Sequence, residues 1–113
     1  MQYKKVTKED IISLIEICGK ENVFVQKEIH EDYSHDELQG LITYPSVLIT
    51  PHSEKEISSV LKYASENLIP VTPRGRGTGL VGGCVSLANG ILLSCHRMNR
   101  ILELDQENLT LTV

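Results

Sequence analysis

Residues 46–79, SVLITPHSEKEISSVLKYASENLIPVTPRGRGTG, carry the strongest signals for a fold class. It opens with a short apolar run suited to a buried strand, and Pro51 stops that run. Ser53 and Glu56 then have the spacing of a capping box at a helix start. Apolar residues follow with the spacing of one helix face: Ile57, Val60, Leu61, Ala64 and Leu68. LIPVTP, residues 68–73, is a second strand candidate, so the order strand, helix, strand predicts a βαβ unit with parallel strands and a right-handed crossover.

The sequence before this stretch predicts one helix and one short strand. TKED, residues 7–10, matches a capping box with Asp10 in the place usually held by Glu or Gln. Apolar residues continue at helical spacing as far as Gly19: Ile11, Leu14, Ile15 and Cys18. NVFVQ, residues 22–26, is a strand candidate, and residues 31–40 predict a polar loop.

The segment after residue 84 has a different character. Residues 85–113 contain Asn-Gly and Glu-Asn turn signals between short apolar runs, without a long helical period, and therefore predict antiparallel strands. The last run, LTLTV at 109–113, alternates cleanly and stops without a turn. We therefore expect the chain to be cut inside a larger domain. The open edge of this strand predicts pairing between copies and hence an oligomer.

These patterns together predict an α+β fold, in which a small parallel βαβ subdomain with flanking helices precedes the start of an antiparallel subdomain. A length of 113 residues suits a single domain. Within it we expect an N-terminal helix and lead-in over 1–32, the βαβ unit and a glycine-rich loop over 33–85, and antiparallel strands over 86–113.

Composition narrows the classes of partner. The chain is 41% hydrophobic and 23% charged, has a net charge of −4, and contains no apolar run long enough to span a membrane. The chain has one Phe, no Trp and only four arginines, all after residue 73, which argues against a nucleic-acid-binding surface. Three cysteines without a CxxC pair indicate reduced thiols, so we expect a cytoplasmic protein without a disulfide framework or a metal site.

The glycine-rich loop PRGRGTGLVGG, residues 73–83, holds five of the eight glycines and two of the four arginines. It leaves the carboxyl end of a predicted parallel strand, where open α/β sheets commonly bind ligands. Glycines let several backbone N–H groups face one concavity, which suits a phosphate, and Thr78 adds a hydroxyl donor. Arg74 and Arg76 either neutralise an anion or pair elsewhere in the fold. The alternative is a flexible surface loop that needs glycine only for its geometry.

Other phosphate-binding and catalytic patterns fit less well. No lysine follows Lys62, which excludes a P-loop. GTGLVG from Gly77 satisfies GxGxxG, but the residues after it do not open a helix as a nicotinamide-binding Rossmann loop requires. The adjacent residues SHD at 34–36 cannot adopt the geometry of a hydrolase triad. The four histidines lack the spacing of metal ligands.

Several ordered motifs resemble one known family. TPHSEKEI, IPVTPRG, GTGLVGG and LSCHRMNRILELD occur in this order within residues 33–113. The segment resembles the FAD-binding domain of the p-cresol methylhydroxylase and vanillyl-alcohol oxidase type, and within it the group that comprises the flavin chain of glycolate oxidase and D-lactate dehydrogenase. Tyr33 and Asp36 match the early part of the family pattern, where the resemblance implies structural contacts between loops.

The resemblance implies a role for each residue of the loop. Its members would wrap the FAD pyrophosphate, chiefly with backbone N–H groups; they are Arg74, Gly75, Arg76, Gly77, Thr78, Gly79 and Leu80, with Gly82, Gly83 and Cys84 continuing the cradle. Related covalent flavoproteins carry a histidine at the position of Thr78, so its absence here implies FAD bound without a covalent link. Arg76 stands where the family commonly has a small residue. No catalytic residue is assigned within this chain.

The resemblance therefore implies a part of a flavin-dependent oxidoreductase that oxidises a small 2-hydroxy acid such as glycolate or D-lactate. We expect the 113-residue chain alone to lack turnover. The alternative is a stand-alone module for a nucleotide or phosphate, or a partner subunit that completes the flavin site of another chain.

Overall fold

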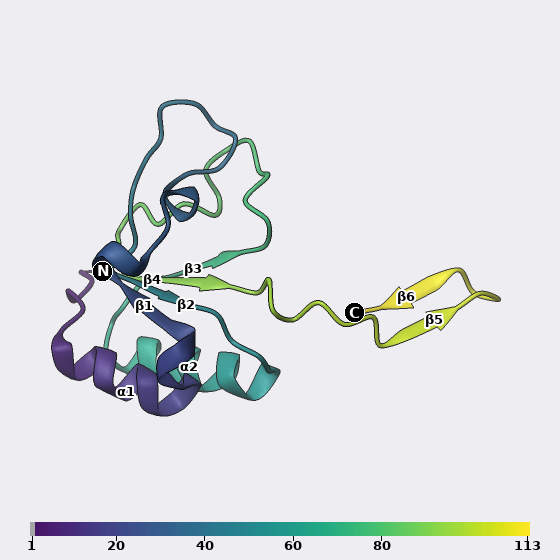
Figure 1. The fold of residues 1–113 in the computed structure, drawn as a ribbon, viewed down its shortest axis with the longest axis horizontal. Helices are drawn as coiled ribbons and strands as arrows, with labels where there is room; N and C mark the ends of the chain where they lie inside the picture. The colour runs from purple at the N-terminus through teal and green to yellow at the C-terminus, as the bar shows by residue number, and fades with distance from the viewer. Residues whose placement is uncertain (1) are drawn as a thin grey trace.

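The computed structural model describes residues 2–113. Its helices and strands are, in chain order, α1 Lys8–Cys18, β1 Val23–Val25, β2 Val47–Ile49, α2 Glu54–Glu66, β3 Val71–Arg74, β4 Ile91–Ser94, β5 Glu103–Asp105 and β6 Thr110–Thr112. Three 3-10 turns lie before β2: η1 Lys20–Asn22, η2 Gln26–Glu28 and η3 Glu31–Ser34. Strands β1 to β4 form one sheet, and β5 and β6 form a separate hairpin (Figure 1).

Both predicted helix starts are present, one of them in full. Thr7 caps α1: its hydroxyl accepts the Asp10 N–H at 3.2 Å, and the Asp10 carboxylate accepts the Thr7 N–H at 2.9 Å. At α2 the Ser53 hydroxyl accepts the Glu56 N–H at 3.3 Å, as predicted. The Glu56 carboxylate, however, accepts the N–H of His52 instead of that of Ser53. The capping box of α2 therefore has only one of its two hydrogen bonds.

The sheet has the strand order β1-β2-β4-β3. The strands β2 and β3 that flank α2 are parallel, as the βαβ pattern predicts, but each pairs with β4 rather than with the other. Strand β1 pairs antiparallel with β2. The sheet thus combines residues from both sides of the expected internal boundaries at residues 32 and 85.

The prediction of antiparallel strands over 86–113 is wrong for Ile91–Ser94. These residues form the parallel strand β4, and all four are buried. An uninterrupted apolar run such as ILL suits a strand covered on both faces, which is the usual position in a parallel sheet. Gly90, at φ +69°, lies so close to the Pro70 carbonyl that a Cβ would stand 2.4 Å from that oxygen. This close approach brings the chain back to the middle of the sheet.

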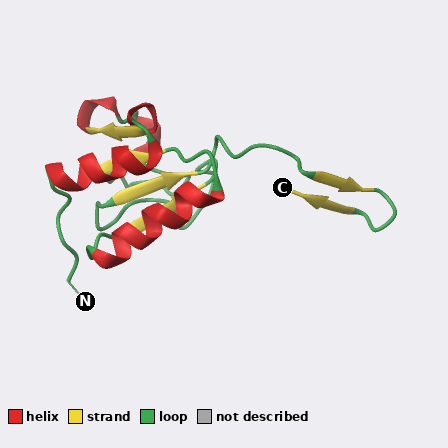
Figure 2. Ribbon diagram, turned by 90° about the horizontal axis from the view of Figure 1, so that it is seen from below, coloured by secondary structure: helices red, strands yellow, loops and turns green. Residues whose placement is uncertain are grey.

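Helices α1 and α2 cover one face of the sheet, as the view from below shows (Figure 2). The main core lies between these helices and the sheet and consists of Leu14, Cys18, Val23, Val47, Ile49, Val60, Ala64, Ile69, Ile91 and Leu93. A smaller core of Ile29, Leu48 and Leu92 lies on the other face, packed against Phe24 and Tyr33. The segments 26–46 and 75–90 rise from that second face (Figure 1).

The hairpin confirms the antiparallel prediction for the last residues. Strand β5 pairs with β6, with Leu104 opposite Leu111. The Asp105 carboxylate accepts the N–H groups of Glu107 and Asn108, both at 3.1 Å, and so closes the turn. The hairpin projects away from the sheet (Figure 1). Within residues 2–113, no helix is both long and apolar enough to cross a membrane.

Candidate functional site

The glycine-rich loop starts at the carboxyl end of β3 and returns to the sheet through Val85 and β4. Of the predicted cofactor-binding residues, Arg74 and Gly82 are buried, and Gly77 and Cys84 are partly buried. The others are exposed: Gly75, Arg76, Thr78, Gly79, Leu80 and Gly83. The structure therefore brings the predicted residues together on one solvent-facing loop, above the carboxyl edge of the parallel strands.

The backbone of this loop presents unused hydrogen-bond donors. Within residues 2–113, no group accepts the N–H of any residue from Arg76 to Val81. The Gly82 N–H is different, because it donates to the Asp36 carboxylate at 2.8 Å. Buried N–H groups are nearly always paired, so a run of open donors places this backbone in contact with solvent or a ligand. Several adjacent N–H groups on a glycine-rich backbone suit an anion such as a diphosphate.

The Arg74 side chain is engaged inside the protein. Its guanidinium donates to the Asp32 carbonyl at 2.7 Å, contacts the Cys84 sulfur at 3.8 Å, and lies 5.5 Å from the centre of the Tyr33 ring. Of the two alternatives for this arginine, the structure favours pairing within the fold. Arg76 is the exposed guanidinium of the loop and is free to meet an anion.

Gly77 is required where the loop passes over this guanidinium. It has φ +75°, and a Cβ at this position would stand 2.1 Å from Nη2 of Arg74 and 2.6 Å from its Cζ. Gly75 and Gly83 have open space where a Cβ would be. Glycine is therefore needed for close packing at Gly77, and it leaves the backbone bare at the other two positions.

A second segment, which includes Asp36 and Glu37, contacts the loop. Asp36 is buried, with 6% of its surface exposed, and its carboxylate accepts the N–H groups of Leu38 at 2.9 Å and of Gly82 at 2.8 Å. The next residue, Glu37, donates its N–H to the Gly79 carbonyl at 3.0 Å. The resemblance implied structural loop contacts for Tyr33 and Asp36, and these contacts are present.

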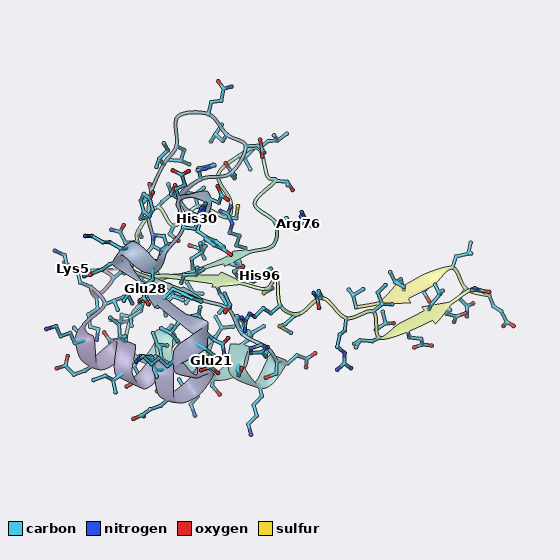
Figure 3. All side chains as sticks on the ribbon, viewed as in Figure 1. Lys5, Glu21, Glu28, His30, Arg76 and His96 are labelled. Carbon is cyan, nitrogen blue, oxygen red and sulfur yellow. The ribbon has the colours of Figure 1, made fainter. Side chains whose placement is uncertain are left out.

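A cleft of about 540 Å³ lies beside the start of the loop. Its walls include Tyr33, Gly75, Arg76, Ser94 and His96, and Figure 3 shows Arg76, His96 and His30 around it. The Ser94 hydroxyl lies 2.9 Å from Nδ1 of His96. Sequence reasoning did not assign Ser94 or His96 to a site. The available signal was their position directly after the apolar run of β4, at the same edge of the sheet as the loop.

A smaller cavity of about 230 Å³ shares Tyr33 and His96 with this cleft. Thr50, at the end of β2, lines it and is 2% exposed. Within the described residues the Thr50 hydroxyl has no hydrogen-bond partner. The carboxyl ends of β2, β3 and β4 thus all contribute polar groups to one edge of the sheet, which is where ligands bind in open α/β folds.

Two curated proteins are similar to this chain over nearly its whole length. The chain is 45% identical to a D-lactate dehydrogenase of Anaerostipes hadrus over 113 residues, which are 99% of this chain and 24% of that protein. It is 39% identical to glycolate oxidase subunit GlcD of Bacillus subtilis (strain 168), over 96% of this chain and 23% of that protein. The chain thus spans about a quarter of the length of these relatives.

Solved structures share the fold. An alkyldihydroxyacetonephosphate synthase superposes with a TM-score of 0.81 at 19% identity, covering 98% of this chain and 23% of that one. A p-cresol methylhydroxylase superposes with a TM-score of 0.73 at 21% identity, covering 91% and 22%. These neighbours confirm the predicted α+β fold of the p-cresol methylhydroxylase type. Residues 45–113 match the family described as FAD binding domain, and the chain therefore belongs to that family of FAD-binding domains.

Proposed function

We propose that the chain is the FAD-binding part of a flavin-dependent oxidoreductase that oxidises a small 2-hydroxy acid, such as D-lactate or glycolate. We further propose that loop 74–84 cradles the FAD pyrophosphate. The observation that carries this proposal is the run of N–H groups from Arg76 to Val81 without acceptors among the described residues. The names of the two curated relatives support the class of substrate.

The residues present fit a pyrophosphate. Open space at Gly75 and Gly83 lets an anion approach the backbone closely, and Arg76 supplies an exposed positive charge. We assign the binding chiefly to the five N–H groups of Gly75 to Gly79, with Leu80 next in the loop and Gly83 and Cys84 at the far end of the cradle. The Gly82 N–H is held by Asp36, so Gly82 contributes through loop geometry. If five N–H groups contribute about 1–2 kcal/mol each, they supply a large share of the roughly 12 kcal/mol of nanomolar binding.

The chain's own contribution to the reaction is binding and orientation. A flavin held at this site would supply the redox chemistry of the oxidation. The loop fixes the pyrophosphate at the sheet edge, and Arg76 balances its charge. The buried Arg74 holds the start of the loop through Asp32 and Tyr33. These groups place the cofactor, and we assign no proton transfer to any residue of this chain.

We propose that FAD is held without a covalent bond, because Thr78 offers no imidazole for attachment. Acid precipitation tests this directly. A non-covalent flavin passes into the supernatant, whereas a flavin that stays with the pellet would contradict the assignment.

The test of the loop uses two variants of one residue. Gly75→Asp adds a negative charge where a Cβ has open space, and Gly75→Asn adds the same shape without the charge. Purified chains are titrated with FAD, FMN and inorganic pyrophosphate, followed by flavin fluorescence and thermal stability. We expect FAD and pyrophosphate to bind the original chain, and we expect Gly75→Asp to weaken both more than Gly75→Asn does. Equal affinities of the two variants would refute pyrophosphate binding at this loop.

The proposed partners are FAD and, in a longer protein, the 2-hydroxy acid; nucleic acid is not among them. Dye reduction that depends on D-lactate or glycolate tests the activity, and we expect none from the 113-residue chain by itself. We also propose a cytoplasmic location, which cell fractionation tests.

A further inference from the structure

The segment from Asp32 to Glu37 contacts the glycine-rich loop at both ends. Near the beginning of the loop, the Asp32 carbonyl accepts a hydrogen bond from Arg74. Near its end, the Asp36 carboxylate accepts the Gly82 N–H, and the Glu37 N–H donates to the Gly79 carbonyl. These partners are more than 40 positions apart in the sequence, so they are tertiary contacts between two loops that have little regular structure of their own.

Asp36 is the side chain that holds the end of the loop. Both of its carboxylate oxygens are used, one by the Leu38 N–H and one by the Gly82 N–H. A Cβ on Gly79 would stand 3.6 Å from the same oxygen that holds Gly82. The carboxylate thus fits against the inner side of the loop between these two glycines. Hydrogen bonds to a buried charged group are among the stronger ones in proteins.

The N–H groups of the loop fall into two sets, one paired within the fold and one unpaired among the described residues. Asp36 accepts the donor that points inward, while the donors from Arg76 to Val81 have no acceptor within residues 2–113. A loop with five glycines has many alternative backbone conformations, and each costs conformational entropy to exclude. A fixed point at Gly79 and Gly82 removes much of that freedom before a ligand binds. Preorganisation of this kind lowers the cost of binding.

We propose that Asp36 is a positioning residue: it holds the Gly79–Gly82 arch so that the unpaired N–H groups before Gly82 converge on the pyrophosphate of the cofactor. This inference rests on the proposed function. It extends that proposal because Asp36 accepts no hydrogen bond from the N–H groups of Arg76 to Val81 and acts through Gly82.

The direction in which one substitution changes FAD affinity separates positioning from simple electrostatics. Asp36→Asn keeps the side-chain shape but removes one of the two acceptors and the negative charge. Loss of a negative charge near an anion site would by itself strengthen anion binding. Loss of positioning would weaken it. Glu37→Gln is the matched control, because it removes the same charge one residue later and keeps the backbone N–H that donates to Gly79.

The experiment measures FAD affinity and backbone amide exchange on the same 113-residue chains. For Asp36→Asn we expect FAD binding about 10- to 100-fold weaker and exchange of the Gly82 amide faster by a similar factor, as loss of a charged hydrogen bond implies. The Ile91 amide, which donates to the Pro70 carbonyl just before β3, serves as the internal reference and should change little. Glu37→Gln should leave both readouts close to the original.

Each other outcome has a defined meaning. FAD affinity in Asp36→Asn equal to or above that of Glu37→Gln, or unchanged Gly82 exchange, would overturn the proposal. If the original chain binds no FAD, the proposed function fails, while faster Gly82 exchange in Asp36→Asn would still support Asp36 as the residue that holds the arch. If Asp36→Asn does not fold, the contact is tested in the original chain by NMR, through the scalar coupling across the hydrogen bond between the Gly82 amide nitrogen and the Asp36 carboxyl carbon. Absence of that coupling refutes the contact.

Discussion

Replacement of Gly77 by alanine should destabilise the protein far more than the same replacement two residues earlier. At Gly77 the backbone has φ +75°, and the new Cβ would stand 2.1 Å from Nη2 of the buried Arg74 guanidinium. The guanidinium must then move away from the Asp32 carbonyl, which it now contacts at 2.7 Å. Gly75→Ala is the control, because its φ is not in the left-handed region and its Cβ meets open space.

The expected loss of stability in Gly77→Ala is the sum of two contributions. A left-handed backbone costs an L-residue about 1–2 kcal/mol, and loss of a hydrogen bond from a buried charged group costs about 1.5–3 kcal/mol, so Gly77→Ala should cost about 2.5–5 kcal/mol. Gly75→Ala should stay within about 0.5 kcal/mol of the original. Since small domains are stable by only about 5–15 kcal/mol, the first change should lower Tm by roughly 10 °C or more.

Urea unfolding followed by circular dichroism measures both variants, and a double-mutant cycle with Arg74→Met identifies the cause. In the Arg74→Met background the guanidinium is absent, so the cost of Gly77→Ala should fall to the backbone strain of about 1–2 kcal/mol. An equal cost in both backgrounds, or a Gly77→Ala chain as stable as Gly75→Ala, would refute the packing argument.

Three further predictions concern acid stability, thiol reactivity and association. Burial alone would raise the pKa of Asp10, but hydrogen bonds from Lys4, Thr7 and Tyr63 hold it well below its usual 3.8. The stabilisation by these hydrogen bonds is therefore present above about pH 4 and lost as the pH falls. The free energy of unfolding of Asp10→Asn, measured in urea, should accordingly depend less on pH below pH 4 than that of the original chain. Burial, and then the Glu56 charge, raise the pKa of Cys18 to about 11. Iodoacetamide at pH 8 should accordingly leave Cys18 unmodified in peptide mass spectra and react first at the partly exposed Cys84 and Cys95. Leu111→Lys on strand β6, whose outer edge and Leu111 side chain are exposed, should reduce self-association in sedimentation experiments; an unchanged distribution would exclude pairing through this strand.

The helices and the position of the loop were predictable because their signals are local. The Thr7 and Asp10 capping box and the apolar spacing of α2 act over a few residues, and both helices begin where these patterns indicate. The order β2, α2, β3 fixed the parallel direction of the two strands, since a helical crossover connects parallel strands. The glycine-rich sequence after β3 was sufficient to identify the candidate site, and its motifs were sufficient to identify the family.

Tertiary structure alone decided which strands pair and which polar groups meet. The run Ile91–Ser94 entered the sheet between β2 and β3 because burial on both faces stabilises an apolar strand more than the antiparallel pairing that its turn signals suggested. Arg74 turned inward toward Asp32, and Asp36 found Gly82, at separations of 42 and 46 residues. Such contacts depend on how distant loops pack over the sheet. The donors and acceptors of each loop are known from its sequence. Only the assembled fold determines which of them pair inside the protein and which remain open for a ligand.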